Sequence, residues 1–258
     1  MAAKRLGPAL LIVGLLFGAV AVAAAEPPII IAPTQIRFGF YAHITPANLP
    51  KSRRTGVSLR IDSKMSTADG SHLPPLKELS LDLDKQMAVN ARGLPACRRP
   101  PLEADDTFGA EMDCKTTIVG EGKAEIEIAQ PEQAPFPVSS KVLAFNAGIF
   151  DGKTKLLLFA YLATPVSAPL LIPVEVSREQ RGIFGLRGVA MVPKIADGYG
   201  SVTHFSLKLG REFTYRGQPQ SYLLASCQSR RLVAKATEVF SDGSRLSGTA
   251  ARACTPQT

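Results

Sequence analysis

Apolar and polar residues alternate with a period of two along most of the chain, and this pattern constrains the fold more than any other feature. Segments 36–40, 57–61, 79–84, 124–128 and 205–209 each place an apolar residue at every second position. Successive side chains of a strand point to opposite faces, whereas a helix needs apolar residues three and four positions apart. The sequence therefore predicts antiparallel strands with one apolar face on a core and one polar face towards solvent.

Asp-Gly pairs lie between these segments and predict tight turns. Hairpin turns need residues with a positive φ, and Asp-Gly pairs adopt it readily. The clearest hairpin surrounds Asp242-Gly243, between the segments ATEVF and RLSGTAARAC. No long segment has helical spacing. Strands at short, regular intervals with Gly and Pro turns predict an all-β, antiparallel β-sandwich, or a barrel, of about ten to twelve strands.

Two segments, 156–163 and 168–176, are almost continuously apolar, which predicts central strands, although Pro173 favours an edge position or a bulge. Three prolines interrupt the alternation at 129–138. This stretch has two interpretations: an internal boundary that divides residues 26–258 into two sandwich halves, or a long crossover between the sheets of one domain.

The first residues have the three parts of a secretory signal peptide. Lys4 and Arg5 precede an apolar run that ends in Ala23-x-Ala25. A retained anchoring helix is the alternative, but Gly and Pro residues within the run weaken it. We therefore expect residues 1–25 to be a signal peptide cleaved after Ala25, and the protein to be secreted or extracytoplasmic.

The chain has four cysteines, and in an exported protein an even number predicts disulfides. Three connectivities are open, and we favour the sequential pairs Cys97–Cys114 and Cys227–Cys254 because each pair brackets a local unit. Zinc sites need close ligand spacings such as C-x-x-C, which the chain lacks. We therefore predict a disulfide-stapled fold without a metal.

The sequence contains no recognisable catalytic motif. The G-x-S-x-G turn of many serine hydrolases is absent, and Ser201 near His204 is explained by a polar strand face. Asp82 and Asp84 point to one side of a strand, as a glycosidase pair would, but such alternation is also typical of a solvated face. We expect no catalytic residue, no phosphate-binding motif and no cofactor.

The segment between the first two cysteines is the candidate binding loop, because rigid scaffolds commonly carry function on such loops. Calcium is an alternative for its acids, but the loop lacks the D-x-D-x-D-G register. Its candidate residues are Arg98, Arg99, Glu103, Asp105 and Asp106.

The formal net charge of +8 is dispersed along the chain rather than gathered in one basic stripe. A dispersed surplus argues against nucleic acid as a partner. Anionic envelope polymers or lipids are the partners that the charge favours in an exported protein. The sequence leaves the oligomeric state open.

Three motifs follow one another in the first half: L-x-L-D-L-D from Leu79, G-L-P-x-C ending at Cys97, and V-G-x-G-x-A from Val119, after Cys114. With the signal peptide, they resemble a group of exported actinobacterial proteins of unknown function that carry a Cys-loop-Cys before a G-x-G strand. The resemblance implies an exported, β-rich, disulfide-bonded protein, and carries over no activity and no binding residue.

The sequence thus favours a non-enzymatic, exported β-sandwich protein of the cell envelope with a binding or structural role. Two alternatives stay open. One is a hydrolase of envelope polymers whose acid pair is assembled from distant strands. The other is a carrier of lipid or a small hydrophobic molecule, in which residues 156–176 line a cavity instead of a packed core.

Overall fold

The computed structural model describes residues 36–97, 106–165 and 167–257, and strands dominate them. The expected signal peptide and the loop residues Arg98 to Asp105 lie outside the described residues. The strands of the first half are β1 (Ile36–Thr45), β2 (Asn48–Pro50), β3 (Thr55–Thr67), β4 (Leu76–Asp84), β5 (Met87–Val89), β6 (Ile118–Ile128), β7 (Phe136–Phe150) and β8 (Lys153–Leu162). Those of the second half are β9 (Ala168–Arg181), β10 (Phe184–Met191), β11 (Gly200–Leu209), β12 (Glu212–Tyr215), β13 (Gln218–Ser221), β14 (Leu223–Ala225), β15 (Arg231–Phe240), β16 (Arg245–Ala253) and β17 (Thr255–Gln257). The helical elements are α1 (Thr107–Asp113) and two 3₁₀ helices, Lys115–Thr117 and Ala196–Gly198.

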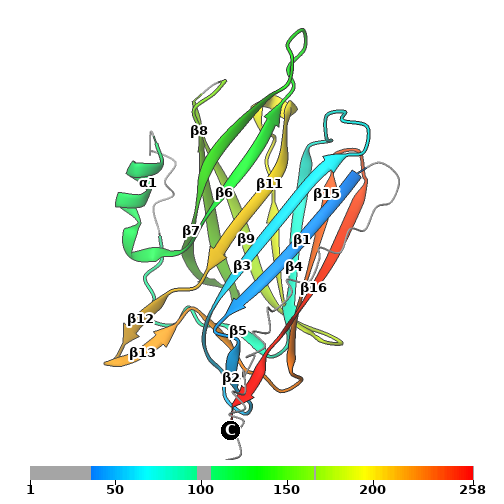
Figure 1. The fold of residues 1–258 in the computed structure, drawn as a ribbon. Helices are drawn as coiled ribbons and strands as arrows, with labels where there is room; N and C mark the ends of the chain where they lie inside the picture. The colour runs from blue at the N-terminus through cyan, green and yellow to red at the C-terminus, as the bar shows by residue number, and fades with distance from the viewer. Residues whose placement is uncertain (1–35, 98–105, 166, 258) are drawn as a thin grey trace, which may run out of the picture.

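Thirteen of these strands form one antiparallel sheet that curls on itself. Its order is β16-β15-β4-β10-β9-β8-β7-β6-β11-β3-β14-β5, and β1 pairs with β3. β1 lies beside β16, where Arg252 Nε donates a hydrogen bond to the Ala42 carbonyl oxygen at 2.6 Å. The walls of the sheet therefore face each other across one interior (Figure 1), which confirms the all-β, sandwich-like fold.

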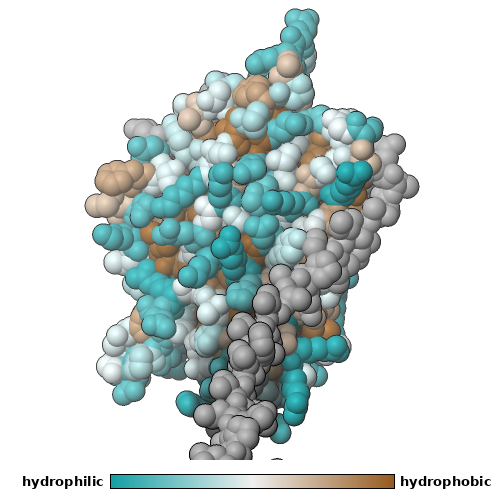
Figure 2. Space-filling view, in the orientation of Figure 1, coloured by the Kyte–Doolittle hydropathy of each residue, from teal (hydrophilic) through white to brown (hydrophobic). Residues whose placement is uncertain are grey.

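The alternation seen in the sequence becomes an apolar inside and a polar outside. In β1, for example, Phe38 and Phe40 are buried, while Arg37 is exposed. One hydrophobic cluster takes residues from almost every strand of the curled sheet, from Ile36 to Cys254. Figure 2 shows the outer surface in this orientation as mostly hydrophilic. Burial of this apolar face is the main stabilising contribution to the fold.

The apolar segments 156–163 and 168–176 correspond to β8 and β9, and both strands have a neighbour on each side, as expected for central strands. Apolar residues also occupy the outer face of these strands, where α1 covers them. There Phe159 of β8 packs with Leu143 and Phe145 of β7 and with Ala110 of α1. Pro173 pairs with Leu157 of β8, but the pairing between β9 and β10 ends at Val174, one residue before Pro173 is reached. Its missing N–H therefore costs no ladder hydrogen bond there.

The structure has more strands than the ten to twelve that the alternation predicts. Six of them, β2, β5, β12, β13, β14 and β17, have only three or four residues, too few for a period of two to stand out. Residues 129–135, within the stretch that offered an internal boundary, connect β6 to β7, and these two strands pair with each other.

Both sequential disulfides are present, which confirms the predicted pairing. Cys97 and Cys114 join the start of the acidic loop to the end of α1 and hold this helix against the outer face of β7 and β8. Cys227 and Cys254 lie at the end of the molecule where the short strands β2 and β17 pair in parallel. Two disulfides of this kind indicate an oxidising environment outside the cytoplasm.

Candidate ligand-binding site

The interior of the curled sheet contains two adjoining apolar cavities. The proximal cavity, of about 90 Å³, lies among inward-facing residues of β3, β4, β8, β9, β10 and β11. The distal cavity, of about 50 Å³, lies among the same walls and β6, β7 and β15. Four side chains line both cavities: Leu79, Leu158, Ala190 and Phe205. The cavities are therefore neighbouring compartments of one apolar interior.

β9 shows the order of these compartments. Leu170 and Ile172 line the distal cavity, and Val174 and Val176 line the proximal cavity. Val176 and Arg178 line a wider pocket of about 450 Å³, which we call the mouth pocket. Alternate residues of a strand share a face and are spaced by about 6.6 Å. The three compartments therefore follow one another along the strand, and all three residues of β5, whose place in the fold Figure 1 shows, line the mouth pocket.

Glu238 on β15 is the one acidic residue among the described residues that line the distal cavity. This side chain is 1% exposed, and its Oε1 accepts a hydrogen bond from the Ser63 hydroxyl of β3 at 2.7 Å. Its Oε2 has no hydrogen-bond partner among the described residues. Burial raises the pKa of the Glu238 carboxyl to about 7, although the Ser63 hydrogen bond opposes the rise. Burying a carboxyl oxygen without a hydrogen-bond partner lowers the free energy of unfolding, unless a ligand or a water molecule forms the missing hydrogen bond.

Tyr222 is the one residue with a polar side chain among the described residues that line the proximal cavity. The residue is 1% exposed, and its hydroxyl has no partner among the described residues. Burial raises the pKa of this hydroxyl above its ordinary value, so it stays protonated and can donate a hydrogen bond. Each cavity thus has an apolar lining and one lining residue with an unsatisfied polar atom. Small-molecule sites also combine apolar walls with a few polar groups, but they are usually larger, at about 300–1,000 Å³.

Sequence reasoning missed both groups, although a signal existed for the first. In β15 the inward positions run Leu232, Ala234, Ala236, Glu238 and Phe240. A charged residue in the apolar register of an amphipathic strand is a conflict that often marks a functional site. Tyr222 precedes the three-residue strand β14, where no alternation indicates which way a side chain faces.

The mouth pocket has a different character, because every charged residue that is described in its lining is basic. These residues are Arg54, Lys85, Arg92 and Arg178, and no Asp or Glu of the described residues lines the pocket. Arg54 is held in place by two backbone oxygens: its Nε donates to Gln86 at 3.0 Å and its Nη2 to Lys85 at 2.9 Å. Val89, Val176 and Leu186 line both this pocket and the proximal cavity. The basic mouth therefore adjoins the apolar interior.

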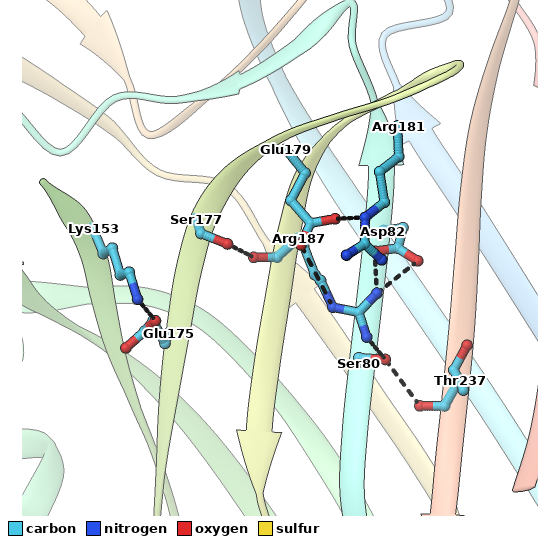
Figure 3. Close-up of polar contacts among 9 residues, drawn as sticks. All are labelled: Ser80, Asp82, Lys153, Glu175, Ser177, Glu179, Arg181, Arg187 and Thr237. Carbon is cyan, nitrogen blue, oxygen red and sulfur yellow. Dashed lines mark hydrogen bonds and ion pairs between the residues drawn. The ribbon is translucent and has the colours of Figure 1, made fainter.

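The outer face of β4, β9 and β10 carries a polar network that is internally satisfied (Figure 3). Arg187 donates to Asp82 at 3.1 Å and to the Ser80 hydroxyl at 3.2 Å. Asp84 accepts from the backbone N–H of Gln86 at 2.9 Å. Asp82 and Asp84 are 9% and 4% exposed, so the prediction of a solvated face was wrong at these two positions. Their partners cover them, and neither carboxylate is left for catalysis.

A second polar chain has the order of a hydrolase triad. Ser201 Oγ lies 3.0 Å from His72 Nε2, and His72 Nδ1 lies 2.7 Å from Glu127 Oε1. However, Ser201 is 0% exposed, and its hydroxyl also donates to the Leu73 carbonyl oxygen at 2.5 Å. A nucleophile must reach the substrate, and this one cannot. The chain instead fastens the β3–β4 loop to β11 and β6. His204, the histidine nearest to Ser201 in sequence, contacts Asp62 at 3.2 Å instead.

Of the five candidate binding residues in the loop, the structure describes only Asp106. This residue is the N-cap of α1, where its Oδ1 accepts from the Gly109 backbone N–H at 2.7 Å. Such a cap satisfies a helix N–H and is a structural role. The other four residues, Arg98, Arg99, Glu103 and Asp105, lie outside the described residues, so their binding role stays a prediction.

Within residues 36–97, 106–165 and 167–257, no group of three or more His, Cys, Asp or Glu is placed to hold a metal ion. In the same part of the chain, no helix has the length and hydropathy needed to cross a membrane. Comparison with known proteins finds no matching protein family, no matching curated protein and no matching solved structure.

Proposed function

We propose that this protein is an exported carrier that holds a small hydrophobic or amphipathic molecule inside its curled sheet. The observation that carries the proposal is the pair of adjoining apolar cavities inside the curled sheet. A closely packed core leaves few voids larger than a water molecule, whereas cavities of this size destabilise a protein by about 24 cal/mol per Å³. A ligand that fills them would recover that stability.

The size of the interior favours a slender ligand. An apolar cavity of about 150 Å³ holds a benzene-sized molecule, so the two cavities, about 50 and 90 Å³, together hold on the order of six carbon atoms. A single aliphatic chain of medium length therefore fits the described compartments better than a bulky ring system or a two-chain lipid.

The other functions considered find less support. A hydrolase needs an accessible pair of acids or a nucleophile. Among the described residues, however, Glu238 is the single acid that lines the two cavities, and Ser201 is buried. A purely structural module has no need of internal voids. Export through a signal peptide cleaved after Ala25 is part of the proposal, and the indicated oxidising environment supports it. The cell envelope is then the place where the carrier works.

The test is binding of a neutral apolar ligand, decan-1-ol, followed by isothermal titration calorimetry. Ala190 lines both cavities, and its neighbour Val189 lines neither. We expect saturable, one-to-one binding by the wild-type protein and by the control variant Val189→Leu. Ala190→Leu fills the junction and should weaken binding at least tenfold while raising the free energy of unfolding. Equal binding by all three proteins, or binding by none, would contradict the proposal.

A further inference from the structure

We infer that the ligand is a single-chain amphiphile with an acidic headgroup, a carboxylate or a phosphate monoester, which lies in the mouth pocket while its chain occupies the cavities. This inference rests on the proposed carrier function and adds the chemical class of the ligand. It is carried by the four basic residues of the mouth pocket and by the continuity of that pocket with the apolar interior.

No carboxylate among the described residues neutralises the charge of the mouth. Lys85, Arg92 and Arg178 have no ion pair with any carboxylate of the described residues. This contrasts with Arg187 on the outer face, which pairs with Asp82 at 3.1 Å. Elsewhere, Lys153 and Lys155 both pair with Glu175. Basic side chains around a concave site attract an anion and raise its local concentration.

The backbone positions these cations with respect to the cavities. Arg178 follows Val176 by two residues on β9, so both side chains belong to the same face of the strand. Arg178 is also the β9 partner of Leu186 on β10, which lines the mouth pocket and the proximal cavity. Arg54 is fixed by backbone carbonyl oxygens, and a guanidinium held in this way binds an anion with less loss of side-chain entropy.

The same arrangement orients the ligand. Along β9, the inward residues change from Arg178 at the mouth to Val176 and Val174, and then to Ile172 and Leu170. From Arg178 to Leu170 the strand spans about 26 Å at about 3.3 Å per residue. A charged group can stay hydrated at the mouth, while burying it next to Glu238 would be costly. The headgroup therefore belongs at the mouth, and the chain extends from it through the proximal cavity towards the distal cavity.

The experiment compares decanoate, decyl phosphate, decan-1-ol and decyltrimethylammonium, which share one chain and differ in headgroup, by calorimetry at low salt. We expect the wild-type protein to bind at least one of the two anions about tenfold more tightly than decan-1-ol, a difference of about 1.4 kcal/mol. The cation should bind more weakly than the alcohol. Added salt should reduce the preference for the anion, because exposed charges are screened.

The decisive variant is Lys85→Gln/Arg178→Gln, which removes two mouth cations. It should bring the affinities for anion and alcohol to within about twofold and leave the affinity for decan-1-ol unchanged. The matched control is Arg60→Gln/Lys64→Gln, which removes two exposed charges of β3 outside the three compartments. This control should keep the tenfold preference.

The outcomes separate this inference from the carrier function. If the wild-type protein binds decan-1-ol as tightly as both anions, the headgroup inference is wrong and the carrier function stands. If Lys85→Gln/Arg178→Gln keeps the full preference, the mouth pocket is not the headgroup site. If none of the four compounds binds, the carrier function itself fails, and this inference fails with it.

Discussion

Glu238 offers the sharpest test of the interior described above, because its environment makes the stability of the fold depend on pH. The carboxyl is 1% exposed, faces an apolar cavity and has one hydrogen bond, from Ser63. Burial raises its pKa to about 7, from an ordinary value of 4.5. The folded protein therefore holds a proton on Glu238 at pH values where the unfolded chain has lost it.

The sign and size of the effect follow from this difference. A raised folded-state pKa contributes stability that is fully present below about pH 4.5 and is lost as the pH rises through about 7. At about 1.4 kcal/mol per pH unit, the full contribution is about 3 kcal/mol, most of it lost between pH 5 and 8. Out of a total of about 5–15 kcal/mol for a typical domain, this loss is large enough to measure.

The perturbation is Glu238→Gln, which keeps an acceptor for the Ser63 hydroxyl but cannot ionise. The assay is urea unfolding followed by far-ultraviolet circular dichroism at several pH values from 5 to 9, for the wild-type protein and the variant. Other titrating groups contribute equally to both proteins. The wild-type free energy of unfolding should therefore fall by about 3 kcal/mol relative to the variant as the pH rises.

A second variant tests the cause. The Ser63 hydrogen bond stabilises the charged carboxylate and lowers its pKa, so Ser63→Ala should raise the pKa of Glu238 further. The pH range in which stability is lost should then move upward. Parallel stability curves for the wild-type protein and Glu238→Gln from pH 5 to 9 would refute the argument, because Glu238 would then be solvated and the cavity open to water.

Three other perturbations test separate parts of the fold. Replacing Cys227 and Cys254 by Ala opens a loop of 27 residues and should lower the free energy of unfolding by about 3–4 kcal/mol, measured by urea unfolding of the oxidised wild-type protein and the variant. Gly122→Ala would place a Cβ 1.9 Å from a backbone oxygen of β11 and should lower the free energy of unfolding by about 2 kcal/mol or more. Gly188→Ala should be tolerated, because the nearest atom to its Cβ would lie at 3.8 Å. Equal melting temperatures for the two variants would contradict this contrast. Ser201→Ala removes two hydrogen bonds of the β3–β4 loop and should lower the free energy of unfolding by about 1–2 kcal/mol. A fluorophosphonate probe, which labels reactive serines, should leave Ser201 of the wild-type protein unlabelled. Labelling at this residue would instead favour the hydrolase.

The sequence by itself determined the strands and their apolar faces, because alternation with a period of two records which side of a strand is buried. It also determined hairpins such as the one at Asp242-Gly243, where the turn needs Gly at positive φ, and Gly243 indeed has a φ of 86°. The disulfide pairing followed from the same logic, since each cysteine pair brackets a local unit. These features depend on residues that are near one another in the chain.

Only the tertiary structure decided how the sheet curls and what its interior contains. Alternation marks the apolar face but does not say whether facing side chains fill the space between two walls. Glu238 accepts a hydrogen bond from Ser63, which lies 175 residues away in the sequence. The mouth pocket is lined by Arg54 and Lys85 from the first half of the chain and by Arg178 from the second half. The candidate loop between Cys97 and Cys114 was inferred from the sequence alone, and its binding role stays a prediction. Sites of this kind depend on strand order, register and curvature, which arise when distant segments pack together and which no local pattern records.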